Sequence, residues 1–137
     1  MSFTILSKFI KDISFEIPDA KTFTMLEKEI SKYNLNFDVK SKPFKNNIIE
    51  VNTILRLVPN EDVTHKMLTE INMATLVSIE KNFEDKKELE KIILVQIPQK
   101  IYPTLYETFV YLFNQAGIKN IEIDKKIDFE KLYKEKK

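Results

Sequence analysis

Residues 3–17 of the chain read FTILSKFIKDISFEI, and this stretch decides the fold class. Apolar side chains favour its odd positions, while the even positions become polar towards its end. A period of two is the signature of a β-strand with one buried face. Leu6 and Ile10 break the alternation, so we expect the early part of this strand to be buried on both sides. Pro18 ends it.

Three further segments continue the alternation. Residues 34–40, 48–58 and 63–80 are predicted to be strands, and residues 41–47 and 59–62 are predicted to be the turns between them. Short turns between neighbouring strands favour antiparallel pairing. The first half of the chain therefore predicts a four-stranded antiparallel sheet.

Helical spacing dominates the second half. Asp85 is suited to cap a first helix, which we expect Pro98 to end. Thr104 and Glu107 form a capping box for a second helix, and Gly117 stands where a helix commonly terminates. The predicted fold class is thus α+β, with two main helices on one side of the four-stranded sheet.

The remaining segments are less regular. Residues 21–33 fit a short helix or a crossover loop equally well. Residues 118–128 are expected to be irregular or briefly extended, residues 129–133 a last helical turn, and residues 134–137 a frayed tail. A length of 137 residues fits one domain, spanning 1–137.

Composition excludes several classes of function. The formal net charge of +1, with 31% charged residues, is a mixed surface and not the basic footprint of a nucleic-acid-binding protein. The chain has no cysteine and a single glycine, which rules out thiolate chemistry and Gly-rich phosphate loops. No leader and no apolar run of about 18–20 residues is evident, so we expect a cytoplasmic protein that does not insert into a membrane.

Candidate catalytic and metal-binding groups are few. The one histidine, His65, falls on the apolar face of the predicted fourth strand, which favours a structural role. Asp124, Asp128 and Glu130 lie close together in sequence, but a solvated turn fits them better than a cation site, which needs several convergent oxygens. We therefore expect no catalytic group, no cofactor and no metal, and a lysine-rich end that is an ordinary surface tail.

Three separated motifs carry a resemblance to a known family. They are KDISFE at 11–16, PQKIYP at 98–103 and IDFEKLY at 127–133. In content, order and spacing they resemble the SecB family of protein-export chaperones. The likeness covers most of the chain and is strongest at 8–20 and 96–133.

The resemblance implies a fold, an activity and an assembly. A SecB-like protein would be a cytoplasmic holdase that binds unfolded preproteins in long apolar grooves and delivers them to the SecA motor ATPase. It would assemble as a homotetramer, a dimer of dimers. Holding an unfolded chain makes and breaks no bond, which agrees with the expected lack of catalytic groups.

The resemblance also implies which residues dock SecA. By position they are Asp12 and Glu16 on the first strand, and Leu68 and Glu70 on the fourth. Each pair shares a parity, so each lies on one face of its strand. The alternative is that all four are ordinary solvated strand residues.

For the groove that binds unfolded clients, the resemblance points to Leu35, Phe37 and Val39. These side chains alternate along one strand, so they share a face. Phe23 and Leu26 are weaker candidates for the groove wall. Packing in the core of the sheet is nearly as good an explanation for the first three.

Some features depart from the family and leave alternatives open. The family usually has a pair of glycines where this chain has Ala74 and Thr75, and it is typically acidic, whereas this chain is nearly neutral. A SecB-like chaperone dedicated to another client, such as an antitoxin, therefore stays open. So does an oligomeric protein of another class, whose apolar groove would hold a lipid-like molecule.

Overall fold

The structure is a computed structural model that describes residues 3–80, 85–119 and 128–135. Its elements follow one another along the chain as β1 (Phe3–Glu16), α1 (Ala20–Glu29), the 3-10 turn η1 (Ile30–Lys32), β2 (Tyr33–Lys45), β3 (Ile48–Pro59), β4 (Leu68–Ile79), α2 (Lys86–Lys91), the π-helical segment η2 (Ile92–Gln96), α3 (Ile97–Gln115) and α4 (Phe129–Glu135).

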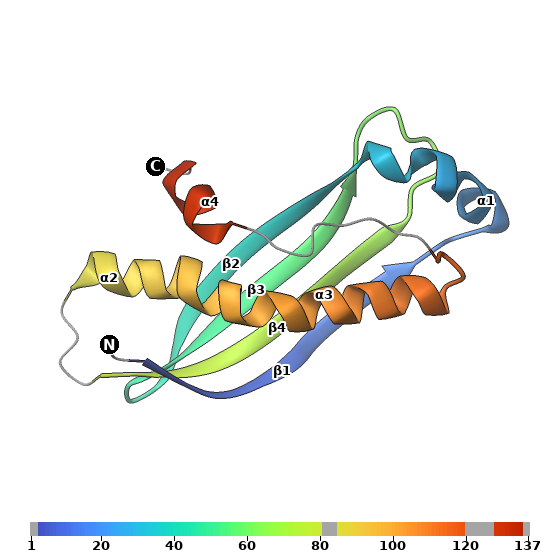
Figure 1. Cartoon of the computed structure of the whole chain (residues 1–137). Coiled ribbons are helices and arrows are strands. Elements are labelled where there is room, and N and C mark those ends of the chain that lie inside the picture. The colour runs from blue at the N-terminus through green and yellow to red at the C-terminus, as the bar shows by residue number, and fades with distance from the viewer. Residues whose placement is uncertain (1–2, 81–84, 120–127, 136–137) are drawn as a thin grey trace.

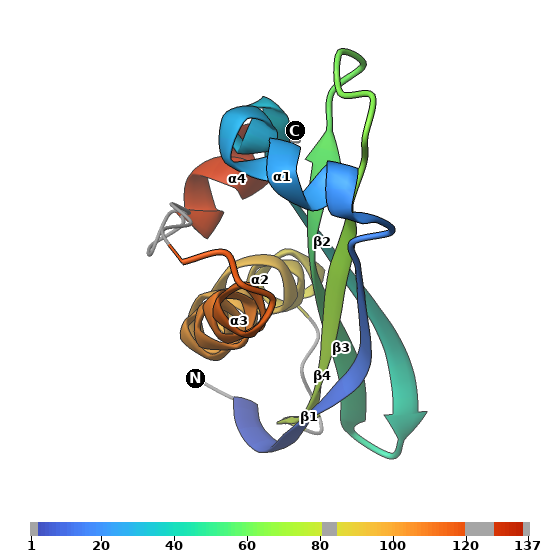
Figure 2. The same ribbon diagram turned by 90° about the vertical axis from the view of Figure 1, so that its right-hand side faces the viewer.

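The four strands form one antiparallel sheet in the order β1-β4-β3-β2 (Figure 1). All four α-helices lie on the same side of this sheet (Figure 2). No element in the described part of the chain covers the other side, which we call the open face. The predicted α+β class, with four antiparallel strands and two main helices on one side, is confirmed.

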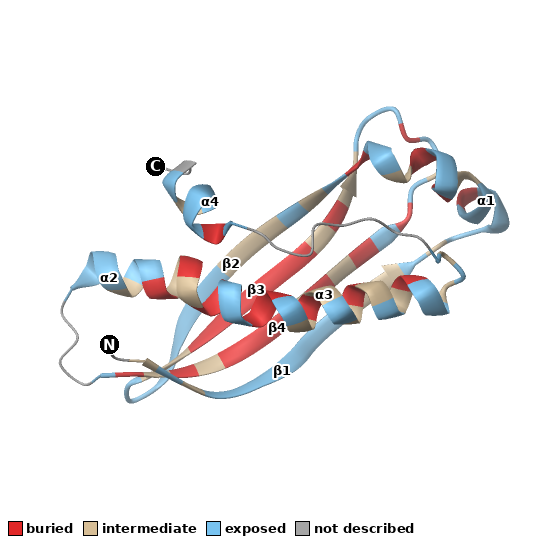
Figure 3. Ribbon diagram, viewed as in Figure 1, coloured by how far each residue is buried: buried red, intermediate tan, exposed pale blue. Residues whose placement is uncertain are grey.

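The core lies between the central strands and the long helix. Odd-numbered side chains are buried from Val51 to Leu57 in β3 and throughout β4, and Leu55 and Ile71 face each other across the two strands with no exposed surface. The facing side of α3 contributes Leu105, Phe109 and Phe113, also fully buried (Figure 3). Burying one such side chain stabilises the fold by about 1.5–3 kcal/mol.

Strand β1 behaves differently from its prediction. Leu6 is 51% exposed and Ile10 is 45% exposed, so the expected burial of this stretch on both sides is wrong for the single chain. β1 is an edge strand, and its register with β4 shifts between Ile5 and Ser7 and again between Ile10 and Asp12. Each shift changes which parity faces the helices, and this is why the alternation is broken.

Helix α1 resolves the ambiguous segment 21–33 in favour of a helix. Asp19 caps it, because its Oδ1 accepts hydrogen bonds from the backbone N–H of Thr22 at 2.8 Å and from the Thr22 hydroxyl at 2.7 Å. These bonds favour the ionised carboxylate and lower the pKa of Asp19 below its ordinary value. An aspartate at this position satisfies an otherwise unpaired N–H of the first helical turn.

The β2–β3 connection is shorter than predicted. β2 extends to Lys45, so the turn is Asn46 and Asn47 and not residues 41–47. Asn46 has φ of 49°, the left-handed conformation that tight hairpins require and asparagine tolerates. The prediction placed Pro43 in a turn, but a proline is tolerated in an edge strand such as β2.

The fourth strand is also shorter than predicted, since it begins at Leu68 and not at residue 63. Val63 and Met67 are nevertheless buried, at 2% and 3% exposure, and the backbone N–H of Met67 donates to the Tyr33 hydroxyl at 3.0 Å. The apolar spacing of Val63 and Met67 thus predicted their burial correctly, although these residues do not belong to a strand. His65 lies in this irregular connection, so its placement on a strand was wrong.

The helices α2 and α3 are joined without a break through η2, and the expected helix end at Pro98 is wrong. The wider π-helical turn directly before Pro98 relieves the clash that a proline ring makes with the preceding turn. The capping box is wrong as well, because Thr104 lies inside α3, where its hydroxyl accepts a hydrogen bond from Lys8 Nζ at 3.2 Å. Gly117 does follow the helix, with φ of 95°, as predicted.

The final helix is longer than the single turn predicted at 129–133. α4 runs from Phe129 to Glu135, so part of the expected frayed tail at 134–137 is helical, and residues 136–137 lie outside the described residues. Most of the segment 118–128, including Asp124, also lies outside them.

Candidate binding surfaces

The open face brings together the four residues that the sequence proposed for partner docking. In the β1–β4 register, Glu16 lies opposite Leu68, and Ser14 lies opposite Glu70. Asp12 lies opposite Asn72, one pair further along. Directly opposite residues project from the same face, so Asp12, Glu16, Leu68 and Glu70 form one continuous patch, which we call the acidic patch.

Within the acidic patch, one carboxylate is already paired. Arg56 of β3 lies directly opposite Glu70, and its Nε and guanidinium amine lie 2.7 and 2.6 Å from Glu70 Oε1. The sequence analysis gave Arg56 no role, although its even position on the third strand placed it on the polar face. Asp12 and Glu16 are exposed, and Leu68 is a large apolar side chain that is 51% exposed beside them.

On the helix side of the sheet, the predicted groove residues Leu35, Phe37 and Val39 line the edge strand β2 and are half-buried. Phe37 is the centre of an aromatic cluster. Its ring centroid lies 5.3 Å from that of Tyr102 and 5.4 Å from that of Phe129, both edge-on. Edge-to-face contacts of this kind stabilise the fold beyond the contribution of apolar burial alone.

The aromatic cluster consists of Phe37, Tyr102, Tyr106 and Phe129. It joins three elements that are far apart in sequence, namely β2, α3 and α4. The sequence analysis did not name its last three members as binding residues. A signal was present, because Tyr102 and Phe129 lie within the motifs at 98–103 and 127–133 that carry the family resemblance.

Helix α4 is held against this cluster by one buried ring and two polar contacts. Phe129 is only 3% exposed. The Tyr133 hydroxyl donates to Glu90 Oε1 at 2.8 Å, and Lys91 Nζ lies 3.3 Å from Glu130 Oε1. Next to these contacts, a shallow hollow of about 340 Å³ lies between β2 and the helical segments α2 and η2.

Phe23 and Leu26 of α1 do not share one surface. Leu26 is 2% exposed and belongs to the main core, so the folded chain does not offer it to a ligand. Phe23 is 40% exposed and packs beside Gly117, at the C-terminal end of α3. Tyr102, which contacts Phe37 of the β2 row, lies about 22 Å from Gly117 along α3, at 1.5 Å per residue. Phe23 and the row Leu35–Val39 are therefore separate regions.

The edge strand β1 presents a third surface. Its exposed large apolar side chains, which we call the β1 strip, are Leu6, Phe9, Ile10 and Ile13. A free strand edge offers unpaired backbone N–H and C=O groups together with these side chains. Such an edge is a template for pairing with another strand.

Across residues 3–80, 85–119 and 128–135, no group of three or more histidine, aspartate or glutamate side chains is placed to hold a metal ion. Within the same residues, no helix is long and apolar enough to cross a membrane.

Comparison with known proteins gives one consistent result. The family model for preprotein translocase subunit SecB matches residues 1–137. A provisionally named protein-export protein SecB of Pelagibacter ubique (strain HTCC1062) is 45% identical over 135 residues, covering 98% of this chain and 96% of that protein. The protein-export protein SecB of Nitrosospira multiformis is 26% identical over 137 residues, covering 98% of this chain and 82% of that protein.

Solved structures agree on the fold. A SecB-like chaperone of Mycobacterium tuberculosis, in complex with a ChAD peptide from an antitoxin, superposes with a TM-score of 0.67 at 16% identity, covering 90% of this chain and 86% of that one. A protein of unknown function from Streptococcus agalactiae gives a TM-score of 0.55 at 9% identity, covering 89% and 96%.

Proposed function

The chain belongs to the SecB family of protein-export chaperones, and from this premise we propose that it is a cytoplasmic holdase that binds unfolded preproteins and delivers them to the SecA motor. The family is not one of enzymes, so the chain performs no covalent chemistry. Its function has to come from surfaces that recognise unfolded chain and partner proteins.

The observation that carries the proposal is the half-buried apolar row of β2 with the aromatic cluster at its side. Leu35, Phe37 and Val39 repeat about every 7 Å along an edge strand, which matches the repeat of an extended client segment. Covering apolar surface is worth roughly 25 cal/mol per Å². A client must be ordered to bind, so a single site would be weak and several sites would act together.

Several sites acting together require more than one copy of the chain, and we propose that the active form is a homotetramer, a dimer of dimers. Support comes from the β1 strip, which leaves four large apolar side chains exposed on an unpaired edge. Pairing β1 with a second copy would join two sheets and cover these side chains. Stable interfaces bury about 1,600 Å² in total, which one strand and its neighbouring helix surface can supply.

We assign delivery to SecA to the acidic patch. Asp12 and Glu16 offer exposed carboxylates, and Leu68, directly opposite Glu16 at the end of the patch, offers an apolar contact. The Arg56–Glu70 ion pair lowers the negative charge that this patch presents. We therefore expect the interaction to depend more on Leu68 and on Asp12 and Glu16 than on Glu70.

A second candidate is a SecB-like chaperone dedicated to another client, such as an antitoxin. The Arg56–Glu70 pair and the near-neutral net charge of +1 favour it, because both weaken long-range attraction of a basic motor segment. In this case the same groove would hold the client, and the acidic patch would have no motor to dock. A bound lipid-like molecule, found after purification, would instead indicate the non-chaperone alternative.

The test dilutes a slow-folding preprotein from denaturant into the chain and follows its refolding, with light scattering after size exclusion. The holdase predicts a tetramer that delays refolding and co-elutes with the unfolded but not the folded client. Phe37→Ala should weaken this retention, while Phe44→Ala, which removes an exposed ring near the β2–β3 turn, should not. A monomer that leaves refolding unchanged would disprove the holdase. If the client is held but SecA does not bind, the dedicated chaperone is favoured.

A further inference from the structure

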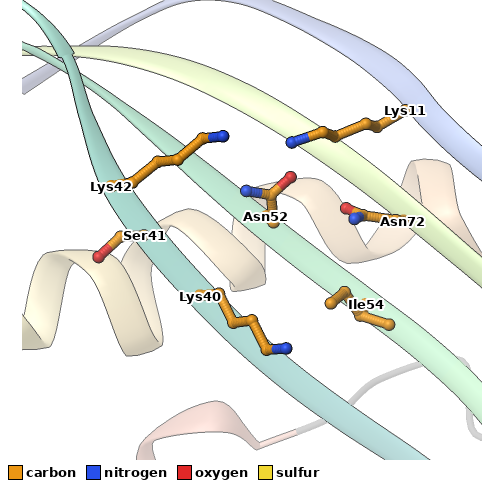
Figure 4. A pocket seen from close by; sticks show the side chains of 7 residues that line it. All are labelled: Lys11, Lys40, Ser41, Lys42, Asn52, Ile54 and Asn72. Atoms are coloured by element: carbon orange, nitrogen blue, oxygen red, sulfur yellow. The ribbon is translucent and has the colours of Figure 1, made fainter.

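The open face has a second feature, at the β2 side and away from the acidic patch. It is a polar hollow of about 370 Å³, which we call the lysine hollow. All four strands contribute to it, and the lining residues that matter here are Lys11, Lys40, Lys42, Asn52 and Asn72 (Figure 4).

The floor of the hollow is polar and incompletely paired. Asn52 is 7% exposed, and its Nδ2 donates to Glu50 Oε2 at 2.9 Å. Its Oδ1 is buried without a hydrogen-bond partner among the described residues, and so is Oδ1 of Asn72. A buried amide oxygen without a donor is unfavourable, and such groups are rare in folded proteins. The floor thus contains two buried acceptors that lack donors, and a ligand reaches them only by entering between the lining side chains.

One side of the hollow is formed by Lys11, which crosses β4. Ala74 lies directly opposite Asn52 and is fully buried, and its small side chain lets a long neighbouring side chain pass over it. Lys11 sits at the register shift of β1 and reaches across β4, placing Nζ 2.6 Å from Glu50 Oε2. Bulges often re-aim a side chain in this way.

The rim of the hollow is positively charged. Lys40 and Lys42 are exposed, and they lie two residues apart on β2 opposite Asn52 and Glu50. Within the described residues Lys42 forms no ion pair, and Lys40 Nζ is only loosely placed at 4.0 Å from Asp38 Oδ2. Lys11, by contrast, already pairs with Glu50. Figure 4 shows the amines of Lys11 and Lys42 directed towards each other above Asn52.

We propose that the lysine hollow docks an extended acidic peptide segment of a partner protein, with carboxylates at alternate positions. Alternate side chains of an extended segment are about 7 Å apart, which is also the repeat between Lys40 and Lys42 along β2. The carboxylates pair with these ammonium groups, and backbone N–H groups of the segment supply the donors that Asn52 and Asn72 lack. The lysine hollow is positively charged and would bind an acidic segment, whereas the acidic patch is negatively charged and would bind a basic one.

Other occupants fit less well. A phosphate ion would pair with the lysines, but it is a single compact anion and does not follow the repeat of about 7 Å between Lys40 and Lys42. A nucleic acid would require a wider basic surface than a chain with a net charge of +1 provides. The peptide is the ligand class that satisfies both the rim and the floor.

The experiment measures fluorescence anisotropy of a labelled peptide of alternating Glu and Thr, titrated with the full chain. Its matched control peptide has Gln in place of Glu. The test variant is Lys40→Glu with Lys42→Glu. The matched control variant, Lys21→Glu with Lys66→Glu, makes the same change in net charge at two exposed lysines elsewhere.

We expect wild type and control variant to bind the acidic peptide alike, and the test variant to bind at least about tenfold more weakly. The Gln peptide should show a similar loss, and added salt should weaken the acidic peptide. An equal loss of affinity in both variants would show that binding depends on the net charge of the chain and not on the lysine hollow, and would overturn the proposal. Absence of peptide binding to wild type would overturn it as well. Displacement of the peptide by an equal concentration of oligonucleotide would assign the hollow to nucleic acid instead.

This proposal does not depend on the holdase. All variants are expected to retain client holding, because the lysine hollow and the groove lie on opposite faces of the sheet. Loss of holding without loss of peptide binding would contradict the proposed function alone.

Discussion

At the scale of single residues, Gly117 shows how one backbone angle restricts sequence. It is the only glycine in the chain, and its φ of 95° is a conformation that other residues rarely adopt. It ends α3 and returns the chain beside Phe23, where an added Cβ would lie 3.3 Å from the ring. The requirement for glycine is therefore both conformational and steric.

We expect Gly117→Ala to lower the free energy of unfolding by about 1–2 kcal/mol, because the left-handed conformation is strained for any residue with a Cβ. Urea denaturation monitored by circular dichroism measures this. Asn46→Gly is the control, since Asn46 also has positive φ and should change stability by less than about 0.5 kcal/mol. Equal stability of Gly117→Ala and wild type would contradict the assignment of strain.

A second residue-scale prediction concerns the Lys11–Glu50 pair. Hydrogen bonds from Lys11 and Asn52 lower the pKa of Glu50 below its ordinary value. A lowered pKa in the folded state means that the pair stabilises the fold above the ordinary carboxyl pKa, about 4.3, and loses this effect as the pH falls through the lower folded value. Lys11 is partly exposed, so the contribution is about 1 kcal/mol or less.

Lys11→Met should therefore be less stable than wild type at pH 7, and the difference should shrink as the pH falls below about 4. Urea denaturation at a series of pH values measures it. Lys8→Met is the control, because Lys8 donates to the neutral Thr104 hydroxyl, and its effect should not depend on pH in this range. A difference for Lys11→Met that is constant down to pH 3 would argue against the pair.

At the scale of elements, α4 depends on the aromatic cluster for its position. Only Phe129 of this short helix is deeply buried, and the Lys91–Glu130 pair is about half exposed on both sides. Seven residues are too few for a stable isolated helix. The helix is therefore formed through its contacts with β2 and α3.

Phe129→Ala removes this anchor, and truncating a buried phenylalanine typically costs about 3 kcal/mol or more. We expect backbone amides of α4 to exchange with solvent at least about tenfold faster, while those of β3 and β4 are unchanged. Hydrogen exchange resolved by NMR tests this. Glu130→Gln, which removes only an exposed ion pair, should have a small effect, and an equal effect of both changes would show that the cluster does not hold α4.

The elements also show what the sequence can and cannot predict. Alternation found all four strands, since the buried parity of β3 and β4 is set by contact with one core. It could not find the end of β2, because Pro43 is tolerated only where the strand lies at an edge. The predicted helix end at Pro98 was wrong for a related reason, because tertiary packing outweighs the local preference of proline. Burial of Ile97 and Ile101 is worth about 1.5–3 kcal/mol each, which offsets a proline cost of about 3 kcal/mol.

The candidate sites were predictable to a similar degree. Parity and family resemblance placed Asp12, Glu16, Leu68 and Glu70 on one face, and the register confirms this placement, while their docking role stays a prediction. Arg56 as the partner of Glu70 was not predictable, because it depends on the exact register between β3 and β4. Leu26 could not be separated from Phe23 without knowing which side of α1 faces the core.

At the scale of the whole molecule, the chain exposes apolar surface in two places with different requirements. In the proposed holdase the row on β2 has to stay open to clients, whereas the β1 strip is covered by a second copy. In the proposed tetramer the β1 strip is the contact between copies and the open face remains free for partners. Assembly and delivery should therefore be separable by mutation.

We expect Ile10→Lys to reduce the assembly to smaller species, because a lysine on a strand edge opposes pairing with another strand. Ile10 is 45% exposed in the single chain, so the change should leave its fold intact. Light scattering after size exclusion gives the mass. Leu68→Lys, at an equally exposed apolar residue of the open face, should keep the mass and lose SecA binding. A full-sized assembly of Ile10→Lys would contradict the role of β1.

The position of β1 in the sheet also has a consequence for biosynthesis. β1 is made before β2 and β3, yet among the described strands it pairs only with β4, whose last residue follows Glu16 by 63 positions. At a ribosome speed of about 5–20 residues per second, β1 waits roughly 3–12 s for its partner. Throughout that interval it is an extended apolar segment without a place to pack. If the proposed holdase activity holds, a newly made copy is itself an unfolded client, and mature copies of the same protein would bind it.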